Sequence, residues 1–157
     1  MKVQKIELLR RITSDLNADG FMVYSPQWHK ENYRFLTEKN FIGPFGVILY
    51  LTKTDETHII YGSDWDQCKN KPLLSKVHVH GTDPYGTVTK LLKEAGVKNL
   101  AVSGKKYIPL DLARAVDLVG TACIPGEGRL ETARMQKTEE EIGYLRQAVS
   151  LADQAWT

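Results

Sequence analysis

The sequence lacks the features that mark secreted, disulfide-linked or membrane-spanning proteins. Only two of its 157 residues are cysteine, Cys68 and Cys123, which excludes a disulfide framework and a four-cysteine zinc site. No apolar run approaches the roughly 20 residues of a membrane helix, because the longest, Val47 to Leu51, has the length of a strand. The first residues mix charges of both signs into their apolar positions, unlike a secretory signal. We therefore expect a cytoplasmic protein with no membrane partner.

The chain also has little excess charge of either sign. Lysine and arginine together number 21 against 19 aspartate and glutamate, which leaves a net charge of +2. Such a balance provides no field that would attract nucleic acid, so no nucleic-acid partner is expected. The sequence is 42% hydrophobic and 25% charged, which is the composition of an ordinary globular domain with one core.

The first half of the chain predicts one helix followed by strands. Apolar residues every three or four positions predict an amphipathic helix over about residues 2 to 17. Phe21 to Tyr24 is a short apolar run typical of a buried strand, and residues 28–37 fit either a short helix or an irregular turn. The apolar segment 45–51 and the segment 57–61 flank a turn-like sequence, so we expect them to pair as an antiparallel hairpin.

The second half alternates strands and helices, which favours a sheet with helices packed on its faces. Asp83 and Pro84 have the residue types of an N-cap and a first helical position, and Gly96 is typical of the residue that ends a helix. We expect strands at 77–80, 98–103 and 118–123, helices at 84–95 and 108–116, and a loop at 124–129.

The last segment predicts a helix that begins well and has no end signal. Thr138 and Glu141 have the spacing of a capping box, in which each side chain bonds the backbone N–H of the other. An apolar stripe follows, and no Gly, Asn or basic C-cap closes it. Either the 157 residues are the front part of a longer polypeptide, which we favour, or the helix simply ends at the surface. The stripe consists of Ile142, Leu145, Ala148, Val149, Ala152 and Trp156.

Two motifs resemble those of a known enzyme family. Residues 134–148 have the spacing Arg-x2-Lys-x3-Glu-Ile-x2-Leu-Arg-x-Ala, and residues 32–37 read Asn-Tyr-Arg-Phe-Leu-Thr. The first is similar to the junction between the two domains of creatinases, prolidases and Xaa-Pro aminopeptidases. The second is similar to the Asn-x-x-Tyr-Leu-Thr-Gly segment of their N-terminal domain. Two departures are Glu38, where the family usually has Gly, and the Gly-rich loop at 125–128.

This resemblance implies an α/β fold, a mixed sheet flanked by helices and similar to ribonuclease H. Residues 1–132 are then the creatinase/prolidase-type N-terminal domain, and 133–157 form a linker and the first helix leading to a C-terminal catalytic domain. The junction residues implied by the motif and the helix stripe are Arg134, Lys137, Glu141, Leu145, Arg146 and Trp156.

The resemblance further implies a non-catalytic domain of an Xaa-Pro dipeptidase or aminopeptidase, serving dimerisation and shaping the entrance to the active site. The partners expected are the chain's own C-terminal catalytic domain and a second copy in a homodimer. Two divalent metal ions (Mn, Co or Zn) are expected in the downstream domain, with no cofactor in these residues. Two alternatives stay open: a creatinase-type amidinohydrolase, and a protein-binding module like the histone chaperones that share this scaffold.

The other candidate residues favour structural roles. His78 and His80 alternate on a predicted strand and could share a metal ion, although no further ligand follows at a suitable spacing. Asp64 and Asp66 fit turn capping better than a nuclease site, because residues 45–51 carry no acid to complete one. Trp65 between them is the residue we consider for contact with substrate or partner, with packing onto the core as the alternative.

No nucleotide-binding or nucleophile motif is complete. Gly126 and Gly128 lack the third glycine of a dinucleotide-binding loop, and the residues after Gly128 do not look like a helix start. Cys123 ends an apolar run and is expected to be a small buried side chain. Four scattered histidines do not indicate any catalytic triad.

Overall fold

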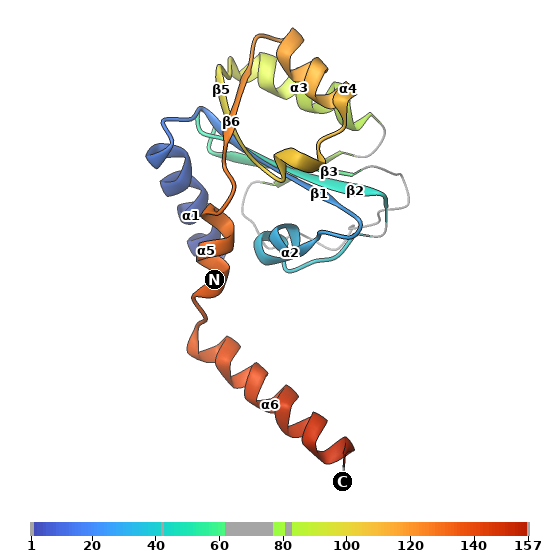
Figure 1. The fold of residues 1–157 in the computed structure, drawn as a ribbon. Coiled ribbons are helices and arrows are strands. Elements are labelled where there is room, and N and C mark those ends of the chain that lie inside the picture. Colours follow the sequence, from blue (N-terminus) through green and yellow to red (C-terminus); the bar gives the residue numbers. More distant parts are fainter. Residues whose placement is uncertain (1, 42, 62–76, 81–82, 157) are drawn as a thin grey trace.

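A computed structural model describes residues 2–41, 43–61, 77–80 and 83–156. Within these ranges the chain forms a six-stranded sheet of order β4-β3-β2-β1-β5-β6, with helices on both faces (Figure 1). The expected α/β fold with a mixed sheet flanked by helices is confirmed. No helix in the same ranges is long and apolar enough to cross a bilayer.

One half of the sheet is largely antiparallel. The strands β1 (Gly20–Pro26), β2 (Phe45–Leu51) and β3 (Glu56–Tyr61) pair as an antiparallel meander, which confirms the expected hairpin between β2 and β3. The next strand, β4 (Val77–His80), pairs parallel to β3.

The other half of the sheet is parallel. The strand β5 (Asn99–Ser103) pairs parallel to β1, and β6 (Ala122–Pro125) pairs parallel to β5. The carboxyl ends of these three strands therefore meet at one edge of the sheet.

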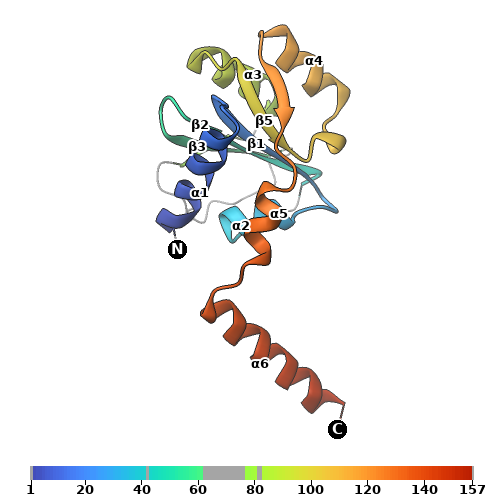
Figure 2. The same cartoon turned by 60° about the vertical axis from the view of Figure 1, so that its left-hand side comes forward.

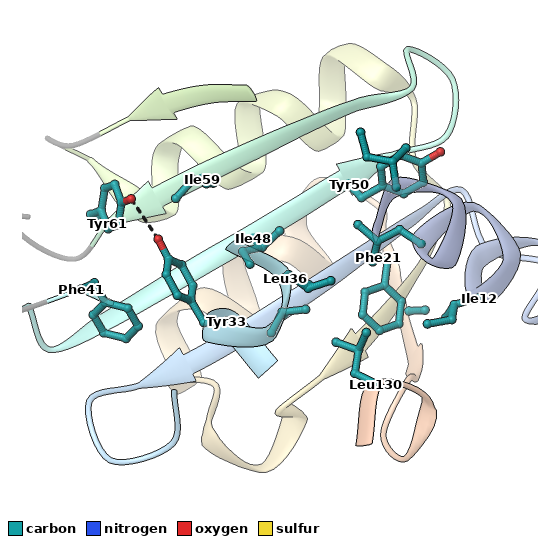
Figure 3. Close-up of a cluster of buried hydrophobic side chains, with 14 residues drawn as sticks. Ile12, Phe21, Tyr33, Leu36, Phe41, Ile48, Tyr50, Ile59, Tyr61 and Leu130 are labelled. Atoms are coloured by element: carbon teal, nitrogen blue, oxygen red, sulfur yellow. Dashed lines mark hydrogen bonds between the residues drawn. The ribbon is translucent and has the colours of Figure 1, made fainter. Parts of the chain in front are cut away.

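One face of the sheet is covered by α1 (Lys2–Asp15), α2 (Glu31–Thr37) and α5 (Arg129–Met135). Residues 28–37, which fitted either a helix or a turn, contain the helix α2. Figure 3 shows side chains from these helices packed against alternate residues of the strands, with Tyr33 donating a hydrogen bond to the Tyr61 hydroxyl at 2.9 Å. Leu130 is fully buried in this cluster, so α5 is part of the domain core.

The opposite face is covered by α3 (Pro84–Ala95) and α4 (Leu110–Leu118), through Val88, Leu92, Leu112 and Val116. Because both faces of the sheet are buried, the central strands are apolar at most positions. The predicted start of α3 is confirmed, since the Asp83 side chain accepts from the backbone N–H of Gly86 at 3.0 Å.

Two expectations for the second half were wrong. Residues 118–123 were expected to be a strand, but α4 continues to Leu118, which is 85% exposed, and β6 begins only at Ala122. Gly120 adopts φ 78° in the turn between them, a conformation that suits glycine. The residues after Gly128 do start a helix, α5, although Gly128 provides no side-chain cap.

Glu38, which departs from the glycine usual in the motif, has a left-handed backbone conformation. Glu38 ends α2 with φ 55° and ψ 21°, the left-handed conformation, and its N–H donates to the Arg34 carbonyl. Glycine is the usual residue at such a position because any Cβ is strained there. Glu38 therefore holds a backbone conformation that glycine would adopt at lower cost.

The last helix, α6 (Glu139–Ala155), extends away from the rest of the domain (Figure 2). Its capping box is confirmed: Glu141 N–H donates to Thr138 Oγ1 at 3.2 Å, and Thr138 N–H donates to Glu141 Oε2 at 2.8 Å. None of its residues is buried. Only its first turns lie near the domain, where Glu140, Glu141 and Tyr144 line a cavity together with Lys5 of α1 and Phe35 of α2.

Candidate functional site

A cavity of about 530 Å³ opens where the carboxyl ends of β1 and β5 lie side by side. The chain leaves β1 toward α2 on one face of the sheet and leaves β5 toward α4 on the other. Connections that diverge in this way leave a crevice outside the strand ends, which is where α/β sheets bind ligands. The cavity is lined by Tyr24, Ser25, His29, Glu31, Asn32, Gly104, Lys106, Tyr107, Glu127, Gly128, Glu131 and Arg134.

Asn32 organises one wall of this cavity. Its Nδ2 donates to Ser103 Oγ at 3.0 Å and to Glu131 Oε1 at 2.7 Å, and its Oδ1 accepts from an Arg134 guanidinium nitrogen at 3.0 Å. One amide thus connects α2, the end of β5 and two turns of α5. The arrangement fixes the positions of Glu131 and Arg134 at the cavity wall.

The floor of the cavity depends on a close approach between β1 and the turn after β5. Gly104 has φ 83°, and a Cβ at this position would lie 2.3 Å from the carbonyl oxygen of Tyr24. The next residue, Lys105, donates its backbone N–H to Glu127 Oε1 at 3.0 Å, which holds the loop after β6 against the same turn. Only glycine permits this packing.

The opposite wall is aromatic. The rings of His29 and Tyr107 stack with centroids 4.6 Å apart, and the Tyr107 hydroxyl lies 2.7 Å from His29 Nε2. The Lys106 ammonium lies 4.8 Å from the centre of the Tyr107 ring, within the range of a cation–π contact. The pKa of Tyr24, which also lines the cavity, is raised, and burial is the largest cause. This phenol therefore stays neutral.

The groups in this cavity suit the binding of a small polar molecule. Within the described ranges, no three His, Cys, Asp or Glu side chains converge to hold a metal ion. The lining provides cations, carboxylates, hydroxyls and a pair of rings, which orient a small polar molecule and supply no activated nucleophile.

The predicted junction residues occupy two different environments. Arg134 lies in the cavity, and the Lys137 ammonium donates to the Arg134 carbonyl oxygen. Glu141 caps α6, and the hydrogen bond from the Thr138 backbone, more than any other cause, lowers the pKa of its carboxyl. Leu145, Arg146 and Trp156 are exposed on α6, with Trp156 92% accessible.

Other candidates from the sequence lie outside this site. Trp65, Asp64 and Asp66 are outside the described residues. The backbones of His78 and His80 are in β4, but their side chains are also outside the described part.

Cys123 does not end its strand as expected, because β6 extends two residues beyond it. It is half-buried against the cluster under α3 and α4, and this burial, more than any neighbouring charge, raises the pKa of its thiol. Cys123 was predicted to be a small buried side chain, and in the structure it is only half-buried.

Sequence reasoning missed most of the cavity. His29, Tyr107, Glu127 and Glu131 share one signal that could have found them: each follows the carboxyl end of a parallel strand. Using that signal requires knowing that β1 pairs with β5, which no local pattern reveals. Asn32 and Arg134 were both within recognised motifs, but nothing in either motif indicates that they touch.

Comparisons with known proteins reveal the same fold in solved peptidase structures. The Xaa-Pro dipeptidase from Bacillus anthracis matches with TM-score 0.78 and 23% identity over 99% of this chain. The X-Pro aminopeptidase from Thermotoga maritima matches with TM-score 0.74 and 20% identity over 97% of this chain. No family model and no curated protein matches the sequence.

These matches cover nearly all of this chain but only part of the longer peptidases. This chain covers only 42% and 41% of those two proteins, so it spans about two fifths of their length. By contrast, it covers 98% of the N-terminal domain of the cytoplasmic peptidase PepQ from Mycobacterium tuberculosis, with TM-score 0.60 and 17% identity over 84% of this chain. The described residues therefore have the fold of the N-terminal domains of prolidases and Xaa-Pro aminopeptidases.

Proposed function

We propose that this chain is the N-terminal, non-catalytic domain of an Xaa-Pro dipeptidase or aminopeptidase. The observation that carries the proposal is the combination of a match over 99% of this chain with coverage of only 42% of the dipeptidase it matches. The junction motif at residues 134–148 supports the same interpretation, because it coincides with the passage from α5 to α6.

In this proposal, α6 is the first element of the interface with a catalytic domain. An amphipathic helix is stable chiefly through burial of its apolar face, and α6 exposes Leu145 to 54%, Val149 to 60% and Trp156 to 92%. Each large apolar side chain that a downstream domain removed from water would contribute roughly 1.5–3 kcal/mol. Arg134, Lys137 and Glu141 hold the start of the helix in position.

The chemistry belongs to the downstream domain in this proposal. That domain would hold the two divalent ions (Mn, Co or Zn) and the water that attacks the bond before proline. The domain formed by residues 1–132 would contribute to a homodimer in the cytoplasm and wall the entrance to the active site, with Trp65 as its substrate- or partner-contacting residue. The creatinase-type and histone-chaperone-like alternatives differ from this proposal only in the nature of the downstream domain.

Expression of the longer coding sequence tests this proposal. We expect the longer chain to hydrolyse alanyl-proline or a longer Xaa-Pro peptide with added Mn²⁺, and the 157-residue chain to be inactive under the same conditions. Cleavage by the purified 157-residue chain would overturn the non-catalytic role. A downstream sequence without metal ligands would instead favour the creatinase-type or scaffold alternatives.

The role of α6 has its own test. In the longer chain, Leu145→Ser combined with Trp156→Ser should lower the free energy of unfolding, because both side chains would be buried there. In the 157-residue chain the same pair should have little effect, since both side chains are already exposed. Gln147→Ser is the matched control on the same helix. Equal effects in both chains would show that α6 is not covered.

A further inference from the structure

The cavity between β1 and β5 carries charges of both signs, and among its described carboxylates only Glu31 lies within ion-pair distance of another lining residue, His29. Arg134 and Lys106 supply two cations, and Glu31, Glu127 and Glu131 supply three carboxylates. Among the described residues, neither cation forms an ion pair: Arg134 bonds the Asn32 amide, and Lys106 lies over the Tyr107 ring. Opposite charges that share a cavity without pairing leave room for a molecule that brings both countercharges.

The positions of these groups are built into the fold. Arg134 and Glu131 are each held by one hydrogen bond with Asn32, and Glu127 is held by the backbone N–H of Lys105. A charged group that is already oriented loses less entropy when a ligand binds, so its contribution to affinity is larger. The volume of about 530 Å³ is also in the range of small-molecule sites.

We propose that this cavity binds a small zwitterion, namely a short peptide with a free ammonium and a free carboxylate. Arg134 and Lys106 receive the carboxylate, because a guanidinium and an ammonium are the donors that suit it. Glu31, whose Oε2 also lies 3.7 Å from His29 Nδ1, and Glu127 receive the ammonium, and the stacked ring faces of His29 and Tyr107 form a wall for the side chain. A ligand with a single charge would pair either with the two cations or with the two carboxylates, but not with both.

This inference goes beyond the proposed function, because it assigns ligand binding to this chain itself. It rests on the cavity and its charges and not on the identity of the downstream domain. The two can therefore fail separately: the proposed function is tested on the longer chain, and this inference on the 157-residue chain.

The first experiment compares three forms of one peptide. Alanyl-proline, its N-acetylated form and its C-terminal amide are each titrated into the ¹⁵N-labelled 157-residue chain, and amide shifts are followed. We expect the free dipeptide to shift the signals of Gly104, Tyr107 and Glu131, and each blocked form to bind at least about threefold more weakly, since each lacks one charge-assisted contact at an exposed site.

The second experiment removes one charge at a time with matched controls. Lys106→Gln and Glu31→Gln change exposed side chains at the cavity. Each is expected to weaken binding of alanyl-proline about two- to fivefold. Lys90→Gln and Glu94→Gln make the same changes in an exposed pair on α3 and should leave binding unchanged.

Four results would overturn the inference. Equal binding of the free and N-acetylated peptides would reveal a plain anion site, and equal binding of the free peptide and its amide would reveal a plain cation site. Absence of shifts at the cavity, while the spectrum shows a folded chain, would mean that it takes no such peptide. Unchanged affinity in both cavity variants would place the binding elsewhere.

Discussion

Arg134 donates a hydrogen bond to Asn32 Oδ1 at 3.0 Å, although 102 positions separate the two residues. Each belongs to one of the two motifs by which the sequence resembles the prolidase family. The contact joins them into one structure, in which the start of α2 positions the end of α5 and hence the exit toward α6. The two motifs are therefore in direct contact in the folded chain.

The first prediction concerns Asn32. Its replacement by alanine removes three hydrogen bonds and leaves Glu131 and Arg134 without their partner. We expect Asn32→Ala to lower the free energy of unfolding by about 2–3 kcal/mol, because a charged group that loses its partner costs more than a neutral one. Urea denaturation measures this, with Arg129→Ala on the exposed side of α5 as control. A loss no greater than that of the control would show the network to be energetically unimportant.

The second prediction concerns the left-handed end of α2. Glu38 has φ 55°, a conformation that costs a residue with a Cβ roughly 1 kcal/mol. Glu38→Gly should therefore raise the thermal midpoint and add about 0.5–1 kcal/mol to stability. Glu38→Ala, which keeps the Cβ, should not. If both variants shift the midpoint equally, the removed charge and not the backbone conformation is responsible.

The sequence predicts the elements of this fold best where a strand is buried on both faces. Residues 45–51 were predicted with the correct bounds because β2 is buried on both faces, so that it consists of apolar residues alone. Leu118 was wrongly placed in a strand because it is apolar, yet it is 85% exposed at the end of α4. The helix α5 begins after Gly128 with no side-chain cap, so its start has no local signature.

The candidate site was less predictable for a different reason. Its residues lie at the end of β1 and on the segments that follow β1, β5 and β6, and their closeness depends on the parallel pairing of these strands. A pairing across some 80 residues is decided by the packing of the whole domain and not by local preference. Arg134 could be singled out only because it lies in a recognised motif, whereas Ser103, which shares the Asn32 amide with it, carries no motif at all.

The third prediction tests the close approach below the cavity. Gly104→Ala would place a Cβ 2.3 Å from the Tyr24 carbonyl oxygen at a positive φ, so the turn must move. We expect a loss of at least about 2 kcal/mol, since both a backbone clash and an unfavourable conformation are introduced. Gly143→Ala on α6 is the opposite case: it has open space around it and should stabilise its helix by up to about 1 kcal/mol. Similar outcomes for the two variants would contradict the described turn.

The last prediction concerns the capping box that starts α6. Thr138→Ala should cost about 1 kcal/mol of local helix stability, seen as faster amide exchange in the first turns of the helix. The same box makes the helix start sensitive to acid. Because the pKa of Glu141 lies below its ordinary value of 4.5 in the folded chain, its stabilising contribution is complete above that pH and is lost as the pH falls through the lowered value.

This acid sensitivity distinguishes loss of the capping box from general fraying at the start of α6. Carbon chemical shifts of residues 139–143 should report loss of helix on acidification in the parent chain. They should change much less in Glu141→Gln, whose amide side chain can keep the bond to Thr138 N–H without titrating. Glu139→Gln, in the same turn, is the control and should behave like the parent chain. An identical acid response in all three would mean that the Glu141 carboxylate does not hold the start of α6.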